Sequence, residues 1–186
     1  MGHRDMNNGS EKEYDKQLEE DFASYLNAKK KQLTQEELKE KVIQFLAENK
    51  ICTLATCLNN IPRSTPLRYR SKDLTIYILT EGGMKVKNIR GNPHVSVSLY
   101  GDYTGFQSVK GLQIWGKAEI IEPEDKERYR QAREIINVEE RDDLKKLGIQ
   151  DVRPDMKIIK IDMERARYLS FPEGILNQIL KVGNQP

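Results

Sequence analysis

The sequence has little of several features that mark particular classes of protein. Its 186 residues include two cysteines, two histidines and one tryptophan. Cys52 and Cys57 lie on one expected strand, where their side chains point to opposite faces and cannot form a disulfide with each other. With no histidine nearby they do not have the spacing of a zinc site. We therefore interpret both as buried thiols.

The chain also lacks an excess of charge of one sign and long apolar runs. Charged residues make up 32% of the sequence, yet the net charge is only +2, so no general attraction to nucleic acid is expected. No run approaches the roughly 18 apolar residues of a membrane span, and the N-terminus lacks the apolar core of a signal peptide. We expect a soluble, cytoplasmic protein without a nucleic-acid or membrane partner.

The first fifty residues predict two helices after a polar tail of little order over residues 1–10. From Glu11 to Lys30, apolar residues recur at helical spacing, which predicts an amphipathic helix docked on the domain or on a second subunit. These residues are Tyr14, Leu18, Phe22, Tyr25 and Leu26. Thr34 and Glu37 form a capping box that opens the second helix. Its inward residues are Leu38, Val42, Phe45 and Leu46.

Alternating strands dominate the region from Ile51 to Tyr100. The segments that separate these strands are Asn59-Asn60, Ser71-Lys72-Asp73, Gly82-Gly83, a basic helix over 84–90, and Asn92-Pro93. The first strand is apolar or small on both faces, which predicts cover on both sides, as in a barrel wall. Pro66 cannot donate to a ladder, so the second strand is expected at an edge or a bulge.

Basic and hydroxyl side chains collect at two places in this region. They are Arg63, Ser64 and Thr65 in the second strand, and Thr80, Lys85 and Lys87 around the glycine pair. Cations, hydroxyls and the free amides at a helix start are the groups that bind a phosphate. The alternative for Lys85 and Lys87 is a solvated helix face, although cations at a helix start oppose its dipole.

The remaining sequence predicts two more strands and peripheral helices. In order, we expect an aromatic loop over 101–108, a strand over 109–121, a helix from Pro123 to about Ile136, a charged segment over 138–147, a strand over 156–169 and a short helix over 175–181.

Three stretches, taken in order, have the spacing of a known family. They are ICTLATCL followed by PRSTPLRYR, then YILTEGGMKVKNIRGNPHVSVSL, and then LQIWGKAEII. Over residues 38–171 the chain resembles the pyridoxamine 5'-phosphate oxidase-like, FMN-binding split-barrel superfamily. The resemblance implies a mainly β fold with peripheral α-helices: an antiparallel split barrel of six or seven strands, which forms a homodimer with two flavins at its interface.

The same resemblance implies domain limits and cofactor contacts. Residues 1–33 are then a tail and amphipathic helix, 34–171 the FMN-binding barrel, and 172–186 a C-terminal helical tail. Lys85 matches the family's phosphate-binding lysine, but Gly83-Met84-Lys85 stands where the family often has Ser-Arg-Lys. The second strand lies along the flavin in the family, and a later strand reaches the partner's flavin. The implied contacts are Arg63, Ser64, Thr65, Pro66, Leu67, Thr80, Lys85, Lys87, Gln113 and Trp115. Ordinary core packing is an equal alternative for Trp115.

The chain end separates this protein from true pyridoxamine phosphate oxidases. Those enzymes carry a C-terminal Trp-and-Arg segment and a substrate-binding Arg-x-His, whereas Arg165 and Arg167 here lack such companions. The resemblance implies an FMN-dependent oxidoreductase with a small-molecule substrate or electron donor that the sequence does not identify. Alternatives are a non-catalytic flavin-binding or sensing module, or a barrel that binds haem or a deazaflavin. His94 is the internal candidate for a haem ligand.

Overall fold

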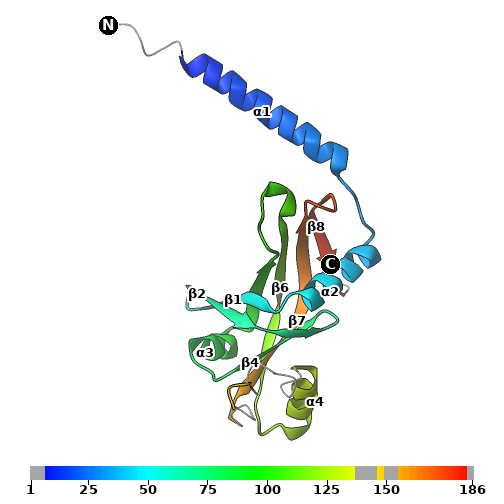
Figure 1. Cartoon of the computed structure of the whole chain (residues 1–186). Helices are drawn as coiled ribbons and strands as arrows, with labels where there is room; N and C mark the ends of the chain where they lie inside the picture. The colour runs from blue at the N-terminus through cyan, green and yellow to red at the C-terminus, as the bar shows by residue number, and fades with distance from the viewer. Residues whose placement is uncertain (1–6, 137–145, 149–154, 184–186) are drawn as a thin grey trace, which may run out of the picture.

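The computed structural model describes residues 7–136, 146–148 and 155–183. It contains a curled antiparallel sheet with three helices against it and a fourth helix, α1 (Asn7–Lys29), that stands away from the body (Figure 1). No helix within those ranges is long and apolar enough to cross a membrane. The expected charged segment over 138–147 falls almost entirely outside the described residues.

Eight strands of the described chain form this one sheet. They are β1 (Ile51–Leu58), β2 (Ile61–Arg68), β3 (Arg70–Lys72), β4 (Thr75–Thr80), β5 (His94–Tyr100), β6 (Lys110–Ile121), β7 (Lys157–Ser170) and β8 (Ile175–Lys181). The order across the sheet is β2-β1-β5-β6-β7-β4-β3, and β8 pairs with β7. The sheet curls into a half-barrel, so the predicted split-barrel class is confirmed, with more strands than the six or seven expected.

Tyr69 sits where the chain passes from one end of the sheet to the other. β2 ends at Arg68 and pairs with β1, whereas β3 begins at Arg70 and pairs with β4. The Tyr69 side chain is buried, and its hydroxyl donates to the Leu46 carbonyl at 2.8 Å. The turn that the sequence predicts over residues 71–73 therefore begins later than expected. Residues 71 and 72 belong to β3, and the turn lies at Asp73, whose φ is 52°.

Three helices cover the barrel. α2 (Gln35–Glu48) begins with the predicted Thr34–Glu37 capping box and buries its four expected apolar residues. The ring of Phe45 lies 5.6 Å from that of Tyr168 of β7. α3 (Met84–Gly91) and α4 (Lys126–Ile136) match their predicted spans closely. The buried residues of α2 and of the sheet form one hydrophobic core, as expected of a barrel domain.

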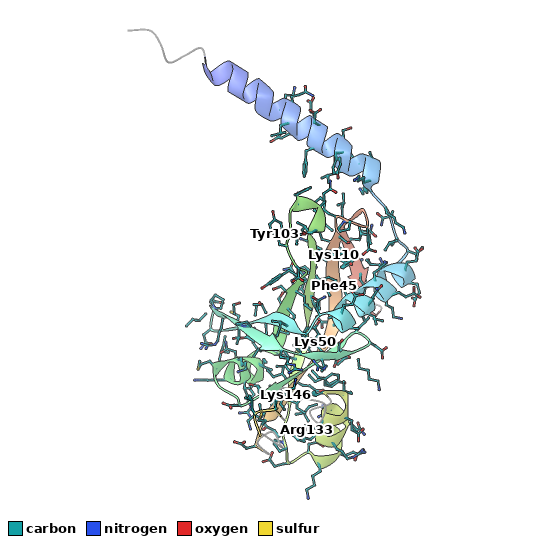
Figure 2. The ribbon with its side chains drawn as sticks, in the orientation of Figure 1. Phe45, Lys50, Tyr103, Lys110, Arg133 and Lys146 are labelled. Carbon is teal, nitrogen blue, oxygen red and sulfur yellow. The ribbon has the colours of Figure 1, made fainter. Side chains whose placement is uncertain are left out.

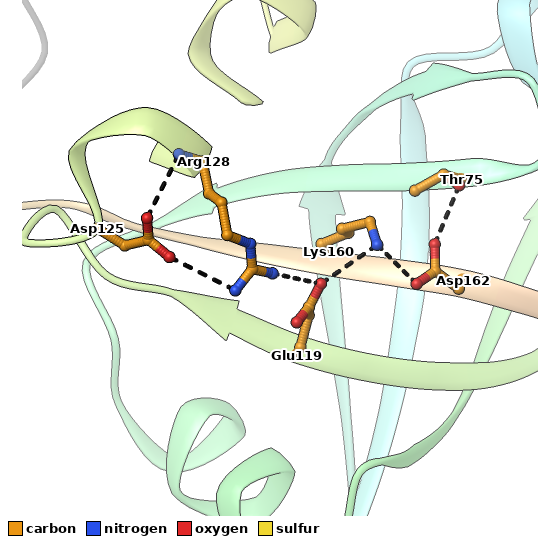
Figure 3. A network of polar contacts seen from close by, with 6 residues as sticks. All are labelled: Thr75, Glu119, Asp125, Arg128, Lys160 and Asp162. Carbon is orange, nitrogen blue, oxygen red and sulfur yellow. Dashed lines mark hydrogen bonds and ion pairs between the residues drawn. The ribbon is translucent and has the colours of Figure 1, made fainter. Parts of the chain in front are cut away.

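A chain of polar contacts fixes α4 against the sheet (Figure 3). Arg128 of α4 binds Glu119 of β6 at 2.7 Å, and Glu119 also accepts from Lys160 of β7 at 3.2 Å. Lys160 binds Asp162 at 2.7 Å, and Asp162 accepts from the Thr75 hydroxyl of β4 at 3.1 Å. Single exposed ion pairs stabilise little, but this network joins α4 to three strands and so sets its position.

Two local predictions were wrong. Residues 175–181 form strand β8 and not a helix, because β7 offers a free edge and the short run ILNQILK fits either structure. Asn177, at φ 50°, lies where the pairing between β7 and β8 shifts register. β1 is also covered on one side only: Cys52, Leu54 and Thr56 are buried, whereas Ile51 and Ala55 on the other face are exposed.

The N-terminal helix differs from its prediction in both start and packing. It begins at Asn7, within the expected tail, and most of it stands clear of the barrel (Figure 2). Leu18 is 56% exposed and Phe22 is 43% exposed. Docking on the domain is therefore wrong for most of the described helix in the single chain. Docking on a second subunit stays a prediction, and the Tyr14 side chain lies outside the described residues.

In the part of α1 whose side chains are described, the contacts with the barrel lie toward the C-terminal end. Phe22 contacts Phe106 of the β5–β6 loop, with ring centroids 5.3 Å apart. Beyond the helix, the Lys31 amide donates to the Gly174 carbonyl at 2.8 Å. Gln178 of β8 accepts from the Leu33 amide at 3.1 Å and donates to the Lys31 carbonyl. We call the contacts of Lys31 and Leu33 with Gly174 and Gln178 the latch, because they hold the base of α1 to the barrel.

Candidate functional site

The register of the sheet places two rows of side chains on its outer face. One row crosses β2, β1, β5, β6 and β7 through Ser64, Ala55, Ser96, Trp115 and Arg165. The next row crosses the same strands through Pro66, Thr53, Ser98, Gln113 and Arg167. Paired residues of neighbouring antiparallel strands project to the same side. All ten side chains are exposed or half-buried, so this face is an open, mostly polar surface.

The other predicted residues of β2 project to the inner face. Thr65 lies opposite buried Leu54, and Leu67 packs against the core. Arg63 shares this inner side but remains exposed at the open edge of the sheet, beside α3. The predicted contacts are therefore divided between two faces: Ser64, Pro66, Gln113 and Trp115 are outside, and Arg63, Thr65 and Leu67 are inside.

Thr80 shapes the loop that leads into α3. Its buried hydroxyl accepts from the Gly82 amide at 3.1 Å and so holds the loop. Gly82 and Gly83 have φ of 117° and 84°, a conformation that suits glycine. Gly83 provides no side-chain cap, and the first amides of a helix have no partner within it. The helix start thus offers donors to an anion.

Arg63 and Lys85 form the cationic part of this inner site. The Lys85 ammonium donates to the Gly82 carbonyl at 2.8 Å. Partial burial, and then the nearby Arg63 charge, lower the pKa of Lys85, with Glu81 acting in the opposite direction. Arg63 and Lys87 line a pocket of about 290 Å³ together with Met84. Two cations that repel each other beside uncapped amides are a suitable environment for a phosphate.

Trp115 lies on the open outer face rather than in the core. It is half-buried, and the Arg165 guanidinium carbon is 4.3 Å from its ring centroid. The Arg167 guanidinium carbon is 5.8 Å from the same centroid. Gln113, on the same strand and face, is exposed. Our sequence analysis did not identify Arg165 and Arg167 as site candidates; their alternation in ERARYL was the available signal.

The remaining reactive groups do not form a second centre in the described part of the chain. Burial raises the pKa of Cys52 to about 12, and Cys57 is a half-buried free thiol. His94 is exposed at the start of β5. Among the described residues no group of three acidic, histidine or cysteine side chains is arranged to hold a metal ion.

Comparison with known proteins identifies the class to which this fold belongs. A family model described as pyridoxamine 5'-phosphate oxidase matches residues 38–170. That is more than half of the chain, and the chain belongs to this family. General stress protein 26 of Bacillus subtilis (strain 168) is 33% identical over 89 residues, which cover 47% of this chain and 63% of that protein. The match thus spans less than two thirds of the relative. The chain is a pyridoxamine 5'-phosphate oxidase-like protein and not a true pyridoxamine phosphate oxidase.

Solved structures show the same fold with different ligands. A FAD-binding protein from Mesorhizobium loti matches with a TM-score of 0.54 and 20% identity over 68% of this chain and 90% of that one. A haem-binding protein from Mycobacterium smegmatis matches with a TM-score of 0.54 and 15% identity over 80% of this chain and 57% of that one. At these identities the likeness establishes the fold and leaves the ligand to be argued from the residues.

Proposed function

We propose that this protein is an FMN-binding flavoprotein and an oxidoreductase that acts as a homodimer in the cytoplasm. The observation that carries the proposal is the pocket that Arg63 lines with Met84 and Lys87 at the uncapped start of α3, where the Arg63 charge also acts on Lys85. Neither Arg63 nor Lys87 has an ion pair within the described residues, so both charges are available. Partial burial and then the Arg63 charge lower the pKa of Lys85, and a bound phosphate offsets the repulsion between the two cations.

Each part of the chain has a distinct role in this proposal. Arg63, Lys85 and Lys87 bind the phosphate together with the first amides of α3, and Thr80 keeps the preceding loop in shape. Ser64, Thr65, Pro66 and Leu67 set the course of β2 along the ring, with Ser64 and Pro66 on the outer face. Gln113 and Trp115 contact the flavin of a second subunit. A bound flavin supplies hydride or electron transfer itself, and the protein orients it and excludes competing reactions.

Haem is less well supported than flavin by the residues of this site. A haem iron needs an axial ligand such as histidine. His94 is the only histidine within the described ranges, and it is exposed at the start of β5. A flavin-binding module without turnover remains the alternative to an enzyme. Steady oxidation of NADH or NADPH by the FMN-loaded protein distinguishes an enzyme from such a module.

The test of the cofactor site compares FMN with riboflavin, which lacks the phosphate. We expect tighter binding of FMN in a fluorescence titration. Arg63→Ala and Lys85→Ala should each weaken FMN binding by about 1.5 to 3 kcal/mol, roughly tenfold to a hundredfold. Riboflavin binding should change little in either variant. Lys16→Ala, a change at an exposed lysine of α1, is the control. Equal affinity for the two flavins in the unmodified protein would rule out this phosphate site.

A further inference from the structure

Arg165 and Arg167, which form no ion pair with a carboxylate among the described residues, lie beside a cleft on the outer face. The cleft has a volume of about 310 Å³, and its polar lining comes from Ser98, Gln113, Arg167 and Asn177. Arg165 lies two residues before Arg167 on β7, and both guanidinium groups approach the ring of Trp115. A glutamine amide, an asparagine amide, a hydroxyl and the Arg167 guanidinium thus line one small space, and Arg165 lies next to it, over the ring of Trp115.

The ion pairs of neighbouring residues make these two arginines unusual. Lys117 of β6 binds Glu164 at 3.5 Å, and Lys160 of β7 binds both Glu119 and Asp162. These pairs occupy all three carboxylates. Within the described ranges, neither Arg165 nor Arg167 forms an ion pair with a carboxylate. Their charges are compensated only by the weaker attraction to one aromatic ring.

We propose that the cleft binds an oxyanion, a carboxylate or a phosphate, of the small molecule that reacts with the flavin. Guanidinium groups bind such oxyanions through paired, charge-assisted hydrogen bonds. Gln113, Asn177 and Ser98 add neutral hydrogen-bonding groups. The assignment of the ligand as the reaction partner rests on the proposed function, since Gln113 and Trp115 are there the residues that face a flavin. The oxyanion site itself depends only on the residues of this face.

Trp115 provides a direct readout because it is the only tryptophan in the chain. It lies two residues from Gln113 of the cleft and three strands from Ser64, about 14 Å at ordinary strand spacing. In FMN-saturated protein the phosphate pocket of Arg63 is already filled, so a change in emission when a probe is added reports on the cleft. The experiment titrates inorganic phosphate, and separately benzoate, into FMN-saturated protein while tryptophan fluorescence is recorded. The two probes distinguish a phosphate site from a carboxylate site. A parallel titration of FMN-free protein keeps the test independent of the cofactor.

We expect a saturable change in emission with at least one probe. Arg165→Gln and Arg167→Gln should each weaken that binding about tenfold to a hundredfold, with FMN affinity unchanged. Lys117→Gln is the matched control, because it removes an exposed charge that is already paired on the neighbouring strand. Circular dichroism checks that each variant is folded.

Three results would overturn the inference. They are unchanged probe binding in both arginine variants, equal weakening in Lys117→Gln, and loss of the dimer by light scattering in the arginine variants without any probe response. The last result would assign the arginines to subunit contact. A probe response in a protein that does not bind FMN would support the oxyanion site and refute the flavin proposal, so the two failures are distinguishable.

Discussion

Gly174 is the point at which the base of α1 meets the barrel, and one added methyl group tests the latch. A Cβ atom at Gly174 would lie 2.0 Å from the Lys29 carbonyl oxygen and 3.2 Å from its carbon. The residue also has φ of 70°, which costs a non-glycine residue about 1 to 2 kcal/mol. The clash forces Lys29–Lys31 outward and weakens the hydrogen bond from the Lys31 amide, worth about 0.5 to 1.5 kcal/mol.

We therefore expect Gly174→Ala to lower the free energy of unfolding by about 1.5 to 3.5 kcal/mol in urea titrations. Gly183→Ala is a matched control, because its φ is 78° but no atom lies within 4 Å of the added Cβ. It should cost only the conformational part, about 1 to 2 kcal/mol. Limited proteolysis should also cut Gly174→Ala faster after α1. Equal destabilisation and equal cleavage in the two variants would refute the role assigned to the latch.

Three further outcomes follow from single features. The first concerns pH: a phosphate at this site is bound by the protonated form of Lys85, and the pKa of Lys85 is lowered. FMN affinity should therefore fall as the pH rises through a value below the ordinary lysine pKa. Lys85→Arg should abolish this pH dependence. Tyr69→Phe leaves the Leu46 carbonyl without its donor and should cost about 1 to 3 kcal/mol in urea unfolding, whereas Tyr100→Phe, at a 77% exposed side chain, should cost almost nothing. Deleting residues 1–32 should leave a folded, FMN-binding protein with a lower melting temperature or weaker dimerisation, whereas deleting residues 1–16 should change neither quantity. Equal melting temperature and dimer affinity for the full chain and both truncated chains would make α1 a free arm.

The fold could be predicted where local patterns and tertiary packing agree. The Thr34–Glu37 box, the strand ICTLATCL and the helix between Gly83 and Asn92 were all correctly placed, because each carries its own start or stop signal. Residues 175–181 were misassigned because their apolar spacing fits two structures and only the free edge of β7 decides between them. The break at Tyr69 could not be predicted, since it depends on a hydrogen bond to another element.

The candidate site was less predictable than the fold. The pattern of basic residues, together with the family resemblance, predicted that Arg63 and Lys85 bind one phosphate, and in the structure the Arg63 charge does act on Lys85. The sequence pattern could not show that the Thr80 hydroxyl accepts from the Gly82 amide, whereas the separation of Ser64 from Arg63 follows from the alternation of any strand and is confirmed. Arg165 and Arg167 were not identified as site candidates, because ion pairing between distant strands is not visible in a linear sequence. It is this pairing that leaves both arginines without a carboxylate partner among the described residues.

The pairing of β4 with β7 has a consequence for synthesis of the chain. Thr75 and its partner Asp162 are 87 residues apart, so β4 cannot complete its ladder until β7 has been made. At 5 to 20 residues per second, the interval is about 4 to 17 s. During that time the β3–β4 hairpin, with Ile76 and Ile78 fully buried in the finished protein, presents an unpaired apolar edge outside the ribosome. Slower translation between β4 and β7 lengthens this exposure and favours capture of the nascent chain by other unpaired strands.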